Sequence, residues 1–254
     1  MPRLAIVSAL HEELHALLPV MQITRRERRA GREFHLGRLD GHEVVLVLSG
    51  VGKVAAAATT AILLDGFEVD ALLFTGVAGG LGAGVAVGDM VVAQELLQHD
   101  LDASPLFPRY EVPLTGRSRF AADAGWSAAL VAGCEHVLTH PQLHPHLAPA
   151  LAGLGIAQPR CHRGLVVSGD RFVSTAAEGA ALQQALPDAL AVEMEGAALA
   201  QVCADFERPY AVLRTISDRA DASAHVDFGR FIGEVAAELS RDIVRAALAA
   251  RLAA

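Results

Sequence analysis

The sequence predicts an α/β fold in which a central β-sheet is flanked by helices. Short apolar runs rich in β-branched residues alternate with alanine-rich segments of helical composition, and several of these runs stop abruptly at glycine or charged residues. The 254 residues are enough for a large core. No Pro/Ser-rich linker, internal repeat or sustained charge run divides the chain, so we expect residues 1–254 to form one domain.

The elements follow from these patterns in chain order. Strands are expected near residues 3–9, 32–38, 42–49, 69–75, 88–96, 162–167, 189–193 and 209–216, with a hairpin turn at Asp40 and Gly41. Helices are expected near residues 11–21, 52–66, 119–133, 175–186, 194–206 and 227–252. The last helix repeats apolar residues at four-residue spacing, which is typical of a structural closing helix. The arginines between 25 and 29 are interpreted as a solvated connection.

Carboxylates follow two of the expected strands directly. Glu193 and Glu195 come after a short apolar run, and Asp218 ends the apolar run from Tyr210 to Ile216. In an open parallel α/β sheet, ligands bind at the carboxyl ends of the strands. One such acid alone fits a helix N-cap, but three together favour a binding site.

Three more of the expected strands also end directly at glycine, polar or charged residues. The first strand ends at Glu12 and Glu13, the strand at 69–75 ends in a glycine cluster, and the run 164–167 ends in Ser168 to Phe172. If these strands are parallel, all five ends open on one edge of the sheet. The glycine cluster lacks GxGxxG or P-loop spacing and therefore identifies no cofactor by itself.

Charge and cysteine content exclude several classes of function. The chain has 21 basic and 29 acidic residues, a net charge of −8, which argues against a nucleic-acid partner. The longest uncharged run, residues 71–88, is shorter than the roughly 20 residues of a membrane helix. Three widely spaced cysteines without a CxxC pair, and no signal-peptide pattern, predict a reducing, cytoplasmic location.

One motif suggests a different enzyme class. Residues His11 to His15 spell HEELH, a match to the zinc-peptidase pattern in which two histidines bind zinc and a glutamate is the base. The match directly follows a buried strand, and no third ligand follows at a recognisable spacing. A second histidine tract, with His136, His140, His144 and His146, is interleaved with prolines and is interpreted as an exposed loop. We therefore expect no metal and no cofactor.

Seven segments together resemble one known family in its order. They are LAIVSALHEE (4–13), SGVGKVA (49–55), TGVAGGL (75–81), GDMVV (88–92), SGDRFV (168–173), VEME (192–195) and RTISDRAD (214–221). The chain is similar along nearly its whole length to the 5′-methylthioadenosine/S-adenosylhomocysteine nucleosidases of the purine nucleoside phosphorylase superfamily. The resemblance implies a mixed sheet and hydrolysis of the N-glycosidic bond of adenine nucleosides.

The resemblance also implies catalytic roles. Releasing a purine requires an acid near the base and a second group that activates water. Asp218 stands at the family's position for the acid that protonates the purine N7, and Glu13 at the position that holds and deprotonates the water. Arg214 would orient the anionic groups.

Further positions would bind the substrate. Glu195 would accept hydrogen bonds from both ribose hydroxyls, with Met194 against the sugar and Glu193 behind them. Phe172 would stack on the purine, and the backbone of Val173 would contact its Watson–Crick edge. The remaining expected contacts below the base and sugar are Val77, Ala78 and Gly79.

Val77 bears on the type of reaction. Phosphorylases of the superfamily hold phosphate with a serine in this turn and with arginines near the N-terminus, but valine has no hydroxyl and residues 6–13 contain no arginine. The sequence therefore favours hydrolysis over phosphorolysis. A nucleoside-binding protein without turnover is an alternative. The presence of both Glu13 and Asp218 argues against it.

The loop from His99 to Gly116 diverges from the common nucleosidases. In those relatives it crosses the dimer interface and helps to cover the 5′ substituent. Phe107, Tyr110 and Pro113 are therefore candidates for the 5′ pocket, either of their own subunit or of the neighbouring one. Val51 would add an apolar wall. The resemblance thus implies a homodimer. It leaves open methylthioadenosine, S-adenosylhomocysteine, 5′-deoxyadenosine and aminofutalosine or futalosine as substrates.

Overall fold

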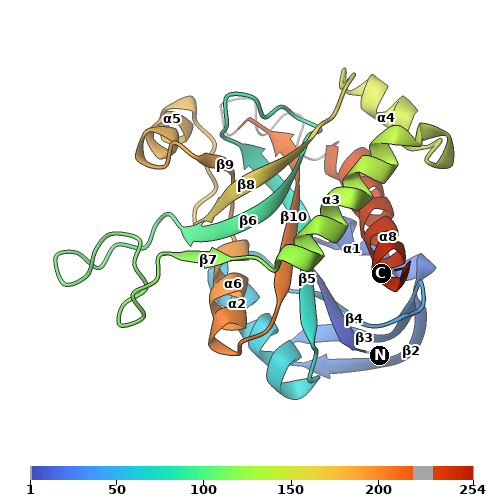
Figure 1. Cartoon of the computed structure of the whole chain (residues 1–254), viewed down its shortest axis with the longest axis horizontal. Coiled ribbons are helices and arrows are strands. Elements are labelled where there is room, and N and C mark those ends of the chain that lie inside the picture. The colour runs from blue at the N-terminus through green and yellow to red at the C-terminus, as the bar shows by residue number, and fades with distance from the viewer. Residues whose placement is uncertain (1, 220–230, 254) are drawn as a thin grey trace.

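The computed structural model describes residues 2–219 and 231–253, and within them ten strands form one mixed sheet (Figure 1). The strands are β1 (Arg3–Ser8), β2 (Gln22–Arg29), β3 (Arg32–Leu39), β4 (His42–Leu48), β5 (Ala71–Gly80), β6 (Met90–Gln98), β7 (Arg119–Ala121), β8 (Cys161–Ser168), β9 (Ala189–Glu193) and β10 (Tyr210–Asp218). The α-helices are α1 (His11–His15), α2 (Lys53–Ala61), α3 (Ala124–Thr139), α4 (Leu147–Gly153), α5 (Ala176–Ala185), α6 (Gly196–Asp205) and α8 (Ala237–Ala253). Short 3₁₀ turns cover Leu18–Val20 and Pro141–Leu143, and π-helical turns cover Ile62–Gly66 and Ile232–Ala236.

Five strands of the sheet close into a ring. The pairs β5–β10, β10–β6, β6–β8, β8–β9 and β9–β5 form a complete circuit, and β1, β4, β3 and β2 extend from β5 in that order. Strands β1, β4, β5 and β10 run parallel, whereas β6, β8 and β9 run in the opposite direction. The expectation that all the site strands are parallel is therefore wrong.

The strand ends nevertheless meet, because the antiparallel contact between β5 and β9 is confined to their carboxyl ends. Gly79 pairs with Val192 and Gly80 with Ala191, so each strand delivers its last residues to the other. Strand β5 reaches this contact because it continues through the glycines to Gly80, beyond the expected end at residue 75.

Apolar side chains alternate between the two faces of the sheet. In β1, Leu4 and Ile6 join a core with α3 and α8, and Ala5 and Val7 join a core with α6 and the π-helical turn that follows α2. This alternation is the period of two that a strand buried on both faces requires. Figure 1 shows the α3–α8 pair on one side of the sheet and the α2–α6 pair on the other.

The arginine-rich segment is a strand and not the expected solvated connection. Residues Gln22–Arg29 form β2, which pairs antiparallel with β3 at the edge of the sheet. Charged side chains on an edge strand discourage pairing with a second sheet, which explains why a strand can have this composition. The Arg29 guanidinium also lies 4.2 Å from the centre of the Phe67 ring.

Other boundaries differ from the expected ones. Helix α1 ends at His15, well before residue 21, and α3 begins at Ala124, where the Asp123 carboxylate caps the helix by accepting from Trp126 N at 2.7 Å. Residues 119–121 form β7 instead of the start of that helix. The expected start of the last helix at 227 lies outside the described residues. None of the described helices has the length and apolar character needed to span a membrane.

The histidine-rich segment is only partly an exposed loop. His136 lies in α3, the segment continues into α4, and the half-buried His144 contacts the Asp242 carboxylate of α8 at 2.6 Å. The short helix α4 was not expected, because prolines obscure its periodicity.

Candidate active site

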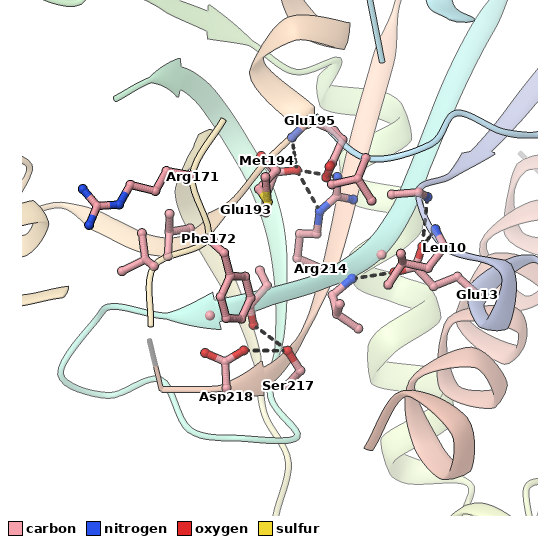
Figure 2. A pocket seen from close by; sticks show the side chains of 18 residues that line it. Leu10, Glu13, Arg171, Phe172, Glu193, Met194, Glu195, Arg214, Ser217 and Asp218 are labelled. Atoms are coloured by element: carbon pink, nitrogen blue, oxygen red, sulfur yellow. Dashed lines mark hydrogen bonds and ion pairs between the residues drawn. The ribbon is translucent and has the colours of Figure 1, made fainter. Parts of the chain in front are cut away.

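A cavity of about 370 Å³ opens where the ends of β1, β5, β8, β9 and β10 meet (Figure 2). Its lining combines apolar walls with four carboxylates and two arginines. The lining residues are Ala9, Leu10, Glu13, Val51, Gly76, Val77, Ala78, Gly79, Arg171, Phe172, Val173, Val192, Glu193, Met194, Glu195, Arg214, Ser217 and Asp218. In Figure 2 the acids stand on different sides of the cavity, and Arg171 points away from them.

Glu13 is held by backbone donors at the junction of β1 and β5. Its Oε2 accepts hydrogen bonds from Ala9 N and Leu10 N, and its Oε1 accepts one from Val77 N, all at 3.0 Å. Burial raises the pKa of this carboxyl group, while the backbone donors and Arg214 act against that rise. The side chain is thus fixed in one orientation, with a basicity above that of an ordinary glutamate.

Glu193 and Arg214 form a fully buried ion pair beneath the cavity. The Oε2 of Glu193 accepts from Arg214 Nη2 at 2.7 Å and Nε at 3.2 Å, while Gly196 N donates to both carboxylate oxygens. Ser168 Oγ donates to Oε1. The guanidinium also lies 4.2 Å from the centre of the Phe74 ring. Such saturation by donors keeps both charges in fixed positions inside the sheet.

Glu195 faces the cavity from the N-cap position that precedes α6. Its Oε1 accepts a hydrogen bond from Gly52 N at 2.7 Å, which links it to the loop between β4 and α2. Burial, and secondly repulsion by Glu193, raise the pKa of Glu195 to about 7. One oxygen of the carboxylate is thereby engaged by the protein.

Asp218 ends β10 opposite these groups. Ser217 Oγ donates to its Oδ2 at 2.9 Å, and the residue is only 4% exposed. Figure 2 shows the Phe172 ring beside this carboxylate, on the loop that follows β8. Phe172 is 39% exposed and lines the cavity with its aromatic ring, a group that can stack on a planar ligand.

The sequence and structure comparisons agree with this geometry. A model of the phosphorylase superfamily matches residues 3–249. A 5′-methylthioadenosine/S-adenosylhomocysteine nucleosidase of Mycobacterium bovis is 37% identical over 249 residues, covering 94% of each chain. This chain belongs to that nucleosidase family.

Solved structures of the nucleosidase family have the same fold. The nucleosidase of Neisseria meningitidis in complex with methylthio-immucillin-A is 33% identical, with a TM-score of 0.83, and the match covers 98% of this chain and all of that one. A futalosine hydrolase of Helicobacter pylori is 28% identical, with a TM-score of 0.81 and 98% of both chains covered. The nucleoside phosphorylase-like fold expected from the sequence is thus confirmed.

Most residues that the resemblance to the nucleosidases suggested lie together around this cavity. The exceptions are Phe107, Tyr110 and Pro113, which do not line it within one chain. They belong to a loop that extends away from the sheet in Figure 1, where Tyr110 packs against an apolar cluster built on β8 and β9 and its ring lies beneath the Arg109 guanidinium. Their role in a neighbouring subunit's site stays a prediction.

Sequence reasoning missed the polar neighbours of the acids. Ser217, Ser168 and Gly52 each hold a carboxylate of the site, yet none was singled out. Ser168 ends β8 and Ser217 lies just before Asp218 in β10, so both belong to the strand-end pattern, which did not by itself give them a role. Gly52 donates through its backbone, for which the sequence carries no direct pattern.

The geometry does not support the zinc-peptidase interpretation. In α1 the side chains of His11, Glu12 and His15 are exposed, whereas Glu13 points into the cavity. Among residues 2–219 and 231–253 there is no group of three or more His, Cys, Asp or Glu side chains placed to hold a metal ion.

Proposed function

We propose that this chain hydrolyses the N-glycosidic bond of 5′-methylthioadenosine and S-adenosylhomocysteine, releasing adenine and a 5-substituted ribose. The nucleosidases among its relatives, together with the acids around the cavity, support this function. A single cavity supplies an acid beside an aromatic ring, a diol acceptor and a buried base.

The backbone donors around Glu13 are the observation that favours water over phosphate as the nucleophile. Three backbone N–H groups that could hold an anion are already occupied by the Glu13 carboxylate. A phosphate placed there would meet the Glu13 carboxylate as a buried like charge, which is unfavourable because the nearby Arg214 guanidinium is already paired with Glu193. Water has no such penalty, and the raised pKa of Glu13 suits it to accept a proton from water.

The other groups divide the work around the ribose. Asp218 donates a proton to the purine N7 as the bond to the anomeric carbon breaks, and Ser217 orients that carboxyl group. Phe172 stacks on the base, and the backbone of Val173 contacts its edge. Glu195 binds the ribose diol with Met194 against the sugar, and the Glu193–Arg214 pair fixes the strand ends beneath them.

The deciding experiment tests nucleophile and base together. We expect adenine to be released from methylthioadenosine and S-adenosylhomocysteine in phosphate-free buffer, together with a free reducing sugar. A requirement for phosphate with formation of a ribose 1-phosphate would identify a phosphorylase. A preference for inosine and guanosine would contradict the role of Asp218, and binding without release would indicate a non-catalytic nucleoside receptor.

Aminofutalosine hydrolysis uses the same chemistry and differs only in the 5′ substituent. Because the 37% identical relative is a methylthioadenosine/S-adenosylhomocysteine nucleosidase, we favour those substrates. Aminofutalosine belongs in the same assay, and activity confined to it would change the substrate but keep the mechanism.

The acid and the base are tested by conservative substitution. Asp218→Asn retains a polar side chain but cannot transfer a proton, and Glu13→Gln cannot accept one from water. Each should lower kcat by roughly two to four orders of magnitude. Circular dichroism and thermal unfolding should match the wild type. Turnover within a few-fold of wild type in either variant would remove that residue from the mechanism.

We also infer a cytoplasmic homodimer, the location from the three isolated cysteines and the dimer from the loop after β6. That loop exposes large apolar side chains, with Leu106 84% and Leu114 91% exposed. Exposed leucines on a protruding loop are typical of a surface that a partner covers.

A further inference from the structure

A second cavity adjoins the proposed active site on the side of β2 and β3. Its volume is about 780 Å³, and Val51 lines both cavities. At the same wall, Leu10 faces the first cavity and the next residue, His11, faces the second. The two cavities therefore border each other at Val51, which is 53% exposed and stands at the end that the nucleosidase interpretation gives to the 5′ substituent.

The second cavity is basic although the chain has a net charge of −8. Its charged and titratable lining consists of Arg26, Arg28, Arg32, His11, His15 and His35, with Glu33 as the one carboxylate among the described lining residues. Arg26 and Arg28 are exposed, and neither forms an ion pair with another residue in the described part of the chain. Two guanidinium groups are thus available to an anionic ligand.

Strand geometry places these two arginines on one face. They stand two residues apart in β2, where side chains alternate, and they pair across to His35 and Glu33 of β3. Arg32 has a different task, because its Nε donates to Ser49 O at 3.2 Å and its Nη2 to Ala55 O at 3.3 Å. It anchors the loop that carries Val51, so the residue at the border of the two cavities is held in place.

We propose that this basic groove binds the amino-acid end of an extended 5′ substituent and so favours S-adenosylhomocysteine over substrates that end in a methyl group. The proposal rests on the function proposed above. Beyond its sulfur, S-adenosylhomocysteine carries two methylene groups and an α-carbon with a carboxylate and an ammonium group. Arg26 and Arg28 would bind the carboxylate, since guanidinium and carboxylate geometries match, and Glu33 would attract the ammonium group.

The test compares two substrates in one variant. Arg26→Gln/Arg28→Gln should lower kcat/KM for S-adenosylhomocysteine by roughly three- to tenfold, mainly through KM, because exposed charge pairs contribute on this scale. Methylthioadenosine does not reach the groove, and its kcat/KM should be unchanged. The matched control is Arg25→Gln, in which the lost guanidinium contacts the Glu27 carboxylate at 2.7 Å and does not line the cavity.

Two further measurements separate charge from shape. Rising salt should weaken S-adenosylhomocysteine turnover by the wild type more than methylthioadenosine turnover, and the double variant should lose that difference. The methyl ester of S-adenosylhomocysteine, which lacks the carboxylate charge, should be hydrolysed equally by both proteins. If the double variant lost kcat/KM equally for the two natural substrates, or for neither, the proposed role of the groove would be wrong. A wild type that hydrolyses neither nucleoside would overturn the function proposed above, and the groove with it.

Discussion

The VEME segment shows how neighbouring residues take different tasks. Glu193 ends β9 and accepts from Arg214, Ser168 and the first N–H groups of α6, whereas only Oε1 of Glu195, two residues later, accepts a hydrogen bond from the described residues. The difference lies in charge compensation, because the Arg214 guanidinium contacts Glu193 directly. Glu195 instead feels Glu193 as a like charge, and this repulsion adds to the effect of burial on its pKa.

The raised pKa of Glu195 predicts a pH-dependent affinity. Its carboxylate accepts from the ribose diol, but its protonated form does not accept from both hydroxyls. With a pKa of about 7, the competent form is lost as pH falls through 7, so affinity should weaken by roughly tenfold per unit below it. Above that pH the affinity should be constant.

Calorimetric titration of methylthioadenosine into the Glu13→Gln variant isolates this effect. Slow turnover keeps the substrate intact. The substitution also removes the Glu13 carboxyl group, whose pKa is raised as well, so its titration no longer contributes to the pH dependence. Adding Glu195→Gln should weaken binding at high pH and flatten its pH dependence. An affinity that is independent of pH in the Glu13→Gln protein would show that the Glu195 charge does not determine ribose binding.

At the scale of elements, the candidate site depends on loops that clamp one another. The Lys53 Nζ contacts Asp100 Oδ1 at 2.6 Å and Gln98 Oε1 at 3.2 Å, and Lys53 N donates to Asp170 Oδ1 at 2.7 Å. Asp170 N in turn donates to Asp100 Oδ2 at 2.8 Å. This cluster ties the loop that supplies Gly52 N to the loop that carries Phe172.

Loosening this clamp should weaken substrate binding more than chemistry. Lys53→Met removes the ammonium group and leaves the Asp100 carboxylate without its cation, so the Gly52 contact to Glu195 is held less firmly. We expect KM for methylthioadenosine to rise roughly tenfold, the equivalent of about 1.4 kcal/mol, with kcat within a few-fold of wild type. Lys53→Arg should retain most of the affinity. A KM unchanged in Lys53→Met would mean that the loops are held by their backbone contacts alone.

Much of the site at this scale was predictable from sequence, and the errors have physical causes. An acid that directly follows a buried strand shows where the strand ends, and this placed Glu13, Glu195 and Asp218 in one site. The same pattern carries no information on strand direction, because the residues of a five-residue strand such as β9 fit parallel and antiparallel pairing equally well. Strand β2 was missed because its charged face is that of an edge strand, which lacks an apolar alternation.

At the scale of the whole molecule, closure of the five-strand ring explains how opposed strands supply one site. The ring brings β5 and β9 together only at their carboxyl ends, and the cavity opens there. Phe107, Tyr110 and Pro113 lie outside the cavity, on the loop that extends away from the ring, and we propose that they serve a neighbouring subunit's site. The sequence could not settle this, because the contacts of that loop would be with a second chain.

We expect two chains to share their active sites, with the loop of one covering the 5′ end of the other. Light scattering at micromolar concentration should give the mass of a dimer. Mixing after mild denaturation and refolding then tests the sharing, with one chain carrying Asp218→Asn and the other Phe107→Ala/Tyr110→Ala. Each homodimer should turn over S-adenosylhomocysteine poorly, the first for lack of an acid and the second for lack of a 5′ wall.

In a mixed dimer, one site combines the intact Asp218 of the second chain with the intact loop of the first. That site is wild type in every contributing residue, so the mixture should recover up to about a quarter of wild-type activity, since random pairing gives half mixed dimers with one good site each. A mixture no more active than the average of its parents would mean that each loop serves its own chain, and a monomeric mass would exclude sharing altogether. A control mixture of Asp218→Asn with Glu13→Gln/Phe107→Ala should stay inactive, because no pairing of those chains assembles a complete site.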